Sequence, residues 1–177
     1  MNITWLDINA SYSHSSLALP ALEAQLTDEV RSLCTINIVS GTIKSSLDQI
    51  IAEVIDSDAQ YILATGWLFN IDYLISVLSR VCSIDPKLKV ILGGPEFLGD
   101  NREFLIRNRF VTSVFKGEGE GVFNDFIKII SNDPKSDEWL KLEGFEYLDH
   151  NDNYISKESV TVQNFIELTP PEKSQYF

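Results

Sequence analysis

The chain has 177 residues, of which 44% are hydrophobic and 23% charged, a balance typical of a globular protein with one sizeable core. Its formal net charge is −12, from 14 Lys and Arg against 26 Asp and Glu. This sign argues against a nucleic-acid partner and against binding to an anionic membrane, because both require a basic face. No stretch reaches the roughly 18 uninterrupted apolar residues of a membrane-spanning helix.

The two cysteines, Cys34 and Cys82, each lie within an apolar stretch, which favours reduced core thiols and a cytoplasmic location. Neither belongs to a Cys-x-x-Cys pair or a Cys/His cluster. We therefore do not expect this chain alone to bind zinc or an iron–sulfur cluster. The first residues lack the basic region and long apolar run of a secretory signal.

Apolar periodicity predicts alternating strands and helices along the first 132 residues. Short apolar runs predict five strands, at residues 3–6, 34–39, 61–64, 89–92 and 112–115. Amphipathic stripes predict helices around residues 17–30, 47–55, 71–82, 102–109 and 122–130. Such alternation predicts a doubly wound, parallel five-stranded α/β sheet of the Rossmann or flavodoxin-like kind. We expect the strand order 2-1-3-4-5.

The pattern changes after residue 132. Residues 133–137 are typical of a linker, and residues 145–148 and 154–156 predict a small β-hairpin. We therefore expect a Rossmann-like binding domain over residues 1–132, followed by a linker and hairpin extension over residues 133–177. The second part shows no core of its own, so it either packs on the sheet or leads to a further domain.

The stretch 90–97 reads Val-Ile-Leu-Gly-Gly-Pro-Glu-Phe and predicts a buried strand that ends at a tight turn. Gly93 and Gly94 permit positive φ and a close approach of the backbone, and Pro95 ends the hydrogen-bond ladder. Ligands of open α/β sheets bind outside the carboxyl ends of such strands. The alternative is that the two glycines only turn the chain into the next helix.

Four loops are expected at this same edge of the sheet. They are residues 7–16, 65–70, 93–97 and 116–119. They carry hydroxyls, amides and glycine backbone, with Tyr12, Trp67 and Phe69 as flat apolar surface, which suits a large polar ligand that has an apolar face. Asn70 is a candidate cap for the helix that follows the second loop.

Residues 117–121, Gly-Glu-Gly-Glu-Gly, are not expected to bind phosphate, because Glu118 and Glu120 would repel it and the dinucleotide fingerprint belongs after the first strand. Glu118 either accepts hydrogen bonds from ligand amides or hydroxyls, or only favours a helix N-terminus through the dipole. For His14, a ligand, an acid/base and a surface role all stay open. A receiver domain is disfavoured because Thr65 stands where its aspartate would be.

Three segments together resemble the N-terminal cobalamin-binding domain of cobalamin-dependent radical S-adenosylmethionine enzymes. They are residues 9–19 (Asn-Ala-Ser-Tyr-Ser-His-Ser-Ser-Leu-Ala-Leu), residues 92–96 (Leu-Gly-Gly-Pro-Glu), and residues 116–120 (Lys-Gly-Glu-Gly-Glu) with Phe123 after them. Their order and spacing across residues 3–130 fit that domain.

The resemblance implies a Rossmann-like domain that holds cobalamin at the carboxyl ends of its strands, with the nucleotide tail entering the sheet region. In such enzymes the domain presents the corrinoid to a following barrel, where an iron–sulfur cluster cleaves S-adenosylmethionine for methyl transfer or related radical chemistry. The positions that the resemblance assigns to cofactor binding are Asn9, Ser11, His14, Leu17, Thr65, Gly66, Asn70, Gly93, Gly94, Pro95, Glu96, Gly117 and Glu118.

Two family motifs are missing. The Asp-x-His-x-x-Gly motif that supplies histidine to cobalt in methionine-synthase-like domains is absent, since His14 has Tyr12 two residues before it and Leu17 three after. Contact of His14 with cobalt stays open. The Cys-x-x-x-Cys-x-x-Cys cluster motif is also absent, so we expect a piece of a longer enzyme that is not catalytic alone. The alternative is a stand-alone flavodoxin-like nucleotide-binding or protein-interaction domain.

Overall fold

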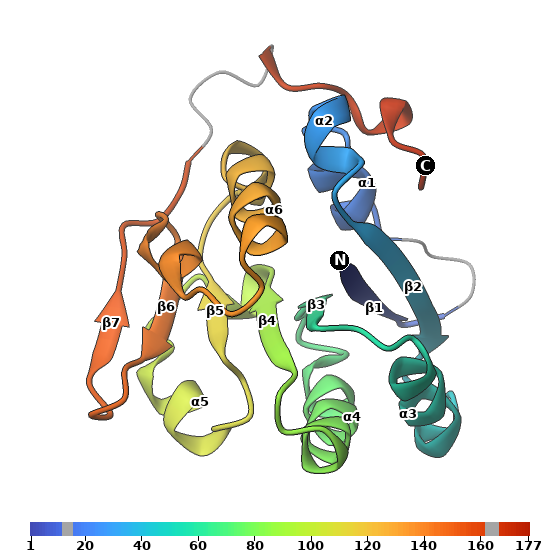
Figure 1. The fold of residues 1–177 in the computed structure, drawn as a ribbon. Helices are drawn as coiled ribbons and strands as arrows, with labels where there is room; N and C mark the ends of the chain where they lie inside the picture. The colour runs from blue at the N-terminus through green and yellow to red at the C-terminus, as the bar shows by residue number, and fades with distance from the viewer. Residues whose placement is uncertain (12–15, 162–166) are drawn as a thin grey trace.

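A seven-stranded sheet runs through the centre of the computed structural model, which describes residues 1–11, 16–161 and 167–177 (Figure 1). The strands are β1 (Asn2–Asn9), β2 (Thr35–Thr42), β3 (Tyr61–Thr65), β4 (Lys89–Gly93), β5 (Ser113–Phe115), β6 (Phe145–Leu148) and β7 (Tyr154–Ser156). The order is β2-β1-β3-β4-β5-β6-β7, and the first five strands are parallel. The predicted α/β class and the order 2-1-3-4-5 are confirmed. The carboxyl ends of these five strands therefore lie at one edge.

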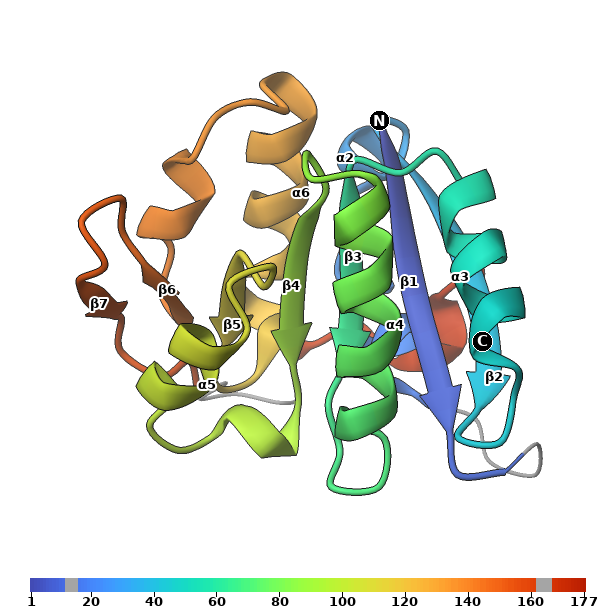
Figure 2. The ribbon, with the colours of Figure 1, turned by 90° about the horizontal axis from the view of Figure 1, so that it is seen from below.

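Helices cover both faces of the sheet. They are α1 (Ala18–Glu23), α2 (Asp28–Arg31), α3 (Leu47–Asp56), α4 (Ile71–Ile84), α5 (Arg102–Arg107) and α6 (Phe123–Asn132), with short 3-10 turns η1 (Pro95–Phe97), η2 (Gly119–Gly121), η3 (Glu138–Lys141) and η5 (Pro171–Lys173). Figure 2 shows α3, α4 and α5 in front of the sheet. Figure 1 shows α1, α2 and α6 on the opposite face.

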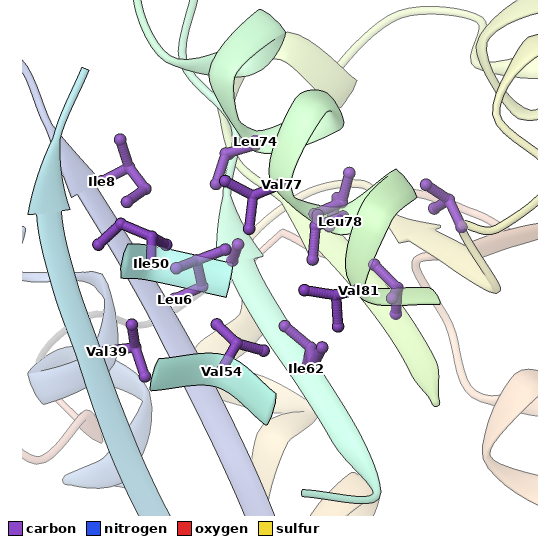
Figure 3. Close-up of a cluster of buried hydrophobic side chains, with 14 of the residues drawn as sticks. Leu6, Ile8, Val39, Ile50, Val54, Ile62, Leu74, Val77, Leu78 and Val81 are labelled. Carbon is purple, nitrogen blue, oxygen red and sulfur yellow. The ribbon is translucent and has the colours of Figure 1, made fainter. Parts of the chain in front are cut away.

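Each face has its own hydrophobic cluster. On the first face, side chains of β1, β2 and β3 interlock with those of α3 and α4 (Figure 3). The labelled residues are Leu6, Ile8, Val39, Ile50, Val54, Ile62, Leu74, Val77, Leu78 and Val81. On the second face, Trp5, Leu63 and Ile91 of the sheet lie in one cluster with Phe123 and Phe126 of α6. Burial of one such side chain contributes about 1.5–3 kcal/mol.

The predicted hairpin forms and joins the sheet, because β6 pairs antiparallel with β5 and β7 with β6. The sheet therefore has seven strands, where the sequence predicts five and a hairpin extension. The predicted boundary at residue 132 falls between α6 and η3. Residues from both sides of it share one core, since Trp139 and Phe145 pack against Phe126 with ring centroids 5.6 Å apart in both pairs.

The single helix predicted over residues 17–30 is wrong, because the chain forms α1 and α2 instead. Thr27 separates them in an extended conformation, and its Oγ1 accepts a hydrogen bond from the Val30 N–H at 3.3 Å, which caps α2. Its own N–H donates to Oδ1 of Asn124 on α6 at 3.0 Å. Contact with α6 thus favours a second cap over a continuous helix.

Among the described residues, no helix combines the length and the apolar character that crossing a membrane would need.

Candidate functional site

A cavity of about 500 Å³ lies between α1 and α6, on the second face of the sheet and near the carboxyl ends of its strands. Trp5, Leu63 and Ile91 of β1, β3 and β4 line it from the sheet. Side chains of the two helices and of β5 and β6 complete the walls, namely Ala18, Leu22, Phe115, Phe123, Phe126 and Phe145. Figure 1 shows α1 and α6 standing apart on this face. The interior is therefore largely aromatic and aliphatic.

We call the end of the cavity at the carboxyl ends of the strands its mouth. The Gly-Gly-Pro turn, residues 93–95, forms one side of the mouth. β4 ends at Gly93, and Gly93, Gly94 and Pro95 all line the cavity. Gly94 has φ +103°, and an added Cβ would lie 2.6 Å from Cγ2 of Thr65. Only glycine fits there, because the turn of β4 presses on the end of β3.

Gly93 differs from its neighbour in what surrounds it. An added Cβ would meet nothing closer than Phe115, at 3.8 Å, which is an ordinary contact. The packing of the protein therefore does not require glycine at this position. Since Gly93 lines the cavity, the missing side chain instead leaves space at the mouth.

The loop after β5 forms the other side of the mouth, where Gly117, Glu118, Gly119 and Glu120 line the cavity. Gly117 has φ +111°, and a Cβ there would collide with the backbone of Val160. The Glu118 N–H donates to the Val160 carbonyl at 3.0 Å. This loop continues into η2 and then α6, so the two glutamates stand before a helix, as predicted.

Asp7 places a carboxylate on the same face of β1 as Trp5, which lines the cavity. It follows Trp5 by two residues on β1, so both side chains leave the strand on the same face. Its Oδ2 accepts a hydrogen bond from Nδ2 of Asn9 at 2.8 Å. Burial raises the pKa of Asp7, and the hydrogen bond from Asn9 opposes that rise in part.

Trp67 and Phe69 give the rim an apolar surface. Their rings are stacked, with centroids 6.3 Å apart and planes 16° apart. Trp67 lines the cavity but is 42% exposed, and Leu68 between them is 83% exposed. A flat apolar surface at this edge agrees with what the sequence predicts for the second loop.

The structure brings six of the predicted cofactor-binding residues to the cavity. They are Thr65, Gly93, Gly94, Pro95, Gly117 and Glu118. Others lie at or just after the ends of the strands and are not among the lining residues, namely Asn9, Ser11, Leu17, Gly66, Asn70 and Glu96. His14 lies outside the described residues. The interior aromatics were not predicted as site residues, because apolar side chains at regular spacing indicate core whether or not a void lies beside them.

Asn70 has a different role from the predicted helix cap. Its buried side chain donates from Nδ2 to the carbonyls of Ile8 at 2.8 Å and Thr65 at 3.1 Å. Its Oδ1 accepts a hydrogen bond from the Trp67 N–H at 2.8 Å. Asn70 occupies the predicted N-cap position of α4, but its side chain makes no cap hydrogen bond to the helix and instead ties the ends of β1 and β3 together.

Gly66 also serves internal packing. An added Cβ would lie 2.6 Å from the ring of Phe97, and the Gly66 N–H donates to the Gly93 carbonyl at 2.7 Å.

Among the described residues, no group of three or more His, Cys, Asp or Glu side chains could hold a metal ion.

Solved structures with the same fold include two radical enzymes. The cobalamin-dependent S-adenosylmethionine radical enzyme OxsB, with aqua-cobalamin and S-adenosylmethionine bound, matches with TM-score 0.73 and 19% identity over 96% of this chain and 23% of that one. The radical S-adenosylmethionine methyltransferase TsrM from Kitasatospora setae, with cobalamin and an iron–sulfur cluster bound, matches with TM-score 0.63 and 12% identity over 96% of this chain and 31% of that one. A CheY-like protein, tadZ, from Pseudomonas aeruginosa PAO1 matches with TM-score 0.51 and 17% identity over 77% of this chain and 98% of that one.

No protein-family model and no curated protein matches the sequence. The predicted resemblance to cobalamin-dependent radical enzymes is confirmed at the level of the fold. This chain spans less than a third of the length of either enzyme, so the likeness concerns one part of them.

Proposed function

We propose that this chain is the cobalamin-binding part of a radical S-adenosylmethionine enzyme. The observation that carries the proposal is the cavity of about 500 Å³ between α1 and α6, which has apolar walls and is lined by residues at the carboxyl edge of a parallel sheet. The fold shared with OxsB and TsrM supports the same assignment.

The cavity suits one part of a cobalamin molecule. Its volume is in the range that holds a drug-sized group, and a whole corrinoid is larger than that. The nucleotide tail ends in a flat aromatic base, which aromatic walls favour by stacking and edge contacts. We assign the tail to the cavity and the corrin ring to the rim outside it, next to Trp67.

Gly93 supports this placement. Because packing of the protein leaves room for a Cβ at this position, the glycine is explained by a ligand that passes the mouth of the cavity. Gly94 and Gly117, by contrast, are required by the backbone around them, so they shape the rim whether or not a ligand is bound.

We propose that the polar contacts between this chain and the corrin ring lie at the rim, outside the cavity. The amide side chains of a corrin ring donate hydrogen bonds, and carboxylates and backbone carbonyls accept them. Glu118 lines the mouth and Glu96 is exposed in η1, so both are proposed to accept from the ring, and Asn9 and Ser11 to contact it from the end of β1. When bound, cobalamin supplies a cobalt centre suited to methyl transfer, and the residues of this chain hold and orient it.

The rest of the enzyme is part of the proposal. A catalytic barrel that follows in the same chain would bind the iron–sulfur cluster and S-adenosylmethionine, and the part described here would not be catalytic alone.

The free thiols of Cys34 and Cys82 favour a reducing compartment, and we place the protein in the cytoplasm. We propose no nucleic-acid and no membrane partner.

A binding experiment tests the proposal. Purified protein is mixed with hydroxocobalamin and desalted, and the visible spectrum of the protein fraction is recorded. We expect the corrinoid to co-elute with the unchanged chain. Gly93→Leu, which puts a side chain at the cavity mouth, should weaken binding at least tenfold, because the blocked volume can no longer take the tail.

The matched control is Gly99→Leu, since a Cβ at Gly99 has nothing within 4 Å and Gly99 does not line the cavity. It should bind like the unchanged chain. Failure of the unchanged chain to retain added hydroxocobalamin would overturn the proposal. Retention of a flavin or an adenine nucleotide in its place would favour the flavodoxin-like alternative.

A further inference from the structure

Two stretches near the C-terminus hold α1, which lines the cavity wall, and the loop after β5, which lines the cavity mouth. Residues 158–160, the rim anchor, pair with the loop after β5. Residues 169–176, the helix anchor, lie against α1, α2 and β2, where Figure 1 shows the red end of the chain beside the two helices. The wall at α1 and the loop after β5 are therefore both fixed by the same part of the sequence.

The helix anchor is joined to α1 through Gln25. Its Nε2 donates to the Thr169 carbonyl at 2.8 Å, and its Oε1 accepts from the Thr169 N–H at 3.1 Å. The same Nε2 also donates to the carbonyl of Ala21 in α1 at 2.9 Å. One carboxamide thus pairs with both backbone groups of Thr169, as a neighbouring strand would.

Glu23 makes a second link. Its side chain is fully buried at the end of α1, and Oε1 accepts from Nε of Arg31 at 2.7 Å. Oε2 accepts from the Gln175 N–H at 3.3 Å. The next residue, Tyr176, donates its hydroxyl proton to the Ile36 carbonyl on β2 at 2.8 Å.

The rim anchor is joined to the loop after β5 through the backbone. Val160 accepts from the Glu118 N–H at 3.0 Å and donates to the Lys116 carbonyl at 3.3 Å. Glu158 accepts from the Gly144 N–H at 2.8 Å. These bonds hold Gly117 and Glu118, which line the mouth.

We propose that these two anchors form a clamp that sets the width of the cavity mouth, with Gln25 and Glu23 as positioning residues for the ligand; this rests on the proposed function. α1 has only six residues, and at its start the Ser16 Oγ accepts a hydrogen bond from the Ala18 N–H at 3.2 Å. So short a helix depends on tertiary contacts for its position. It supplies Ala18 and Leu22 to the cavity wall. A Cβ at Gly119 would lie 2.7 Å from Cδ2 of Leu22, so the loop after β5 and α1 lie in close contact.

The clamp predicts an effect on release of the ligand. Gln25→Ala removes both bonds to Thr169 and leaves the lining residues in place, so α1 moves away from the mouth more often. We expect hydroxocobalamin to dissociate from the full chain about fivefold faster or more, the factor that loss of one or two hydrogen bonds supplies. The measurement is the dissociation rate of bound hydroxocobalamin, followed by its visible spectrum.

The matched control is Gln49→Ala, since Gln49 lies on α3 at the opposite face and its side chain donates to Glu53. Its dissociation rate should equal that of the unchanged chain. Hydrogen exchange of the α1 amides, measured without ligand, should be faster in Gln25→Ala and unchanged in Gln49→Ala.

The outcomes separate the two proposals. If the unchanged chain does not bind hydroxocobalamin, the proposed function fails, and the clamp as a device for that ligand fails with it. If the unchanged chain binds and Gln25→Ala releases the ligand at the same rate, the clamp is wrong and the function stands. Faster exchange in α1 without faster release would likewise reduce Gln25 to a structural role.

Discussion

The carboxylate of Glu146 is fully buried in the sheet and is surrounded by donors. It accepts hydrogen bonds from Nδ2 of Asn101 at 2.7 Å and from the hydroxyls of Tyr154 and Ser156, both at 2.6 Å. Nζ of Lys116 lies 3.9 Å from it. Burial raises the pKa of Tyr154 to about 12, and the hydrogen bond to Glu146 adds to the rise. This network joins the loop before α5, β5 and the hairpin.

Glu146→Ala should destabilise the protein strongly. The change leaves three donors without their acceptor and opens a void, which together cost about 3 kcal/mol or more. Urea unfolding measures the loss. Glu103→Ala is the control, because Glu103 is 79% exposed and pairs with Arg107 one turn away, and it should cost less than about 0.5 kcal/mol. Equal losses for the two variants would contradict the assigned network.

Asp7→Asn should stabilise the protein at neutral pH. The pKa of Asp7 is raised in the folded state by burial, so its ionised form costs free energy above that pKa, and the cost disappears as the pH falls through it. Asparagine keeps an acceptor for Asn9 without the charge. The free energy of unfolding should therefore be higher in Asp7→Asn at pH 7, and the gain should shrink toward about pH 4. A gain that does not vary with pH would contradict this explanation.

At the scale of the elements, local sequence patterns predicted which strands form, whereas tertiary contacts decided a helix break and the role of a side chain that the sequence did not predict. Short apolar runs and turn residues predicted the five parallel strands and the hairpin, because both signals lie within a few neighbouring residues. The break between α1 and α2 was not predictable, since it depends on the contact between Thr27 and Asn124 far along the chain. Asn70 is similar, because its partner Ile8 belongs to another strand.

The turns of the candidate site were predictable from the local sequence, and its apolar walls were not. The Gly-Gly-Pro turn and the Gly-Glu-Gly-Glu stretch were found because glycine and proline mark special backbone, and both line the cavity. The apolar walls of the cavity were not predicted from the sequence, because Trp5, Phe123 and Phe126 have the spacing of ordinary core residues. Only coordinates distinguish an apolar side chain that faces a cavity from one that is fully packed.

Gly117→Ala should deform the loop after β5. A Cβ at this position meets the backbone of Val160, which cannot move aside as a side chain can, and φ is +111°. We expect a loss of roughly 2 kcal/mol in the free energy of unfolding and weaker binding of hydroxocobalamin. Gly99→Ala is the control, because its Cβ would lie in open space. A stable Gly117→Ala variant that binds like the control would show that the loop does not need this backbone geometry.

At the scale of the whole molecule, the second face of the sheet depends on residues from both sides of position 132. Trp139 is fully buried, and its ring centroid lies 6.1 Å from Tyr61 of β3 and 5.1 Å from Phe145 of β6. Phe126 of α6 packs against the rings of Tyr61, Trp139 and Phe145, and it also lines the cavity. The hairpin therefore supports the wall of the site as well as extending the sheet.

A fragment of residues 1–132 should accordingly fail to fold stably. It lacks Trp139 and Phe145, exposes Tyr61 and Phe126, and leaves β5 as an unpaired edge. Burial of two large aromatic side chains and their partners contributes about 5 kcal/mol or more, which is comparable to the whole stability of many domains. Urea unfolding followed by circular dichroism should show no cooperative transition for this fragment, whereas residues 1–161, which keep the hairpin and Val160, should unfold cooperatively. A transition of the shorter fragment at the midpoint of the full chain would mean that the first 132 residues form an independent domain, because the aromatic contacts across position 132 would then contribute nothing to its stability.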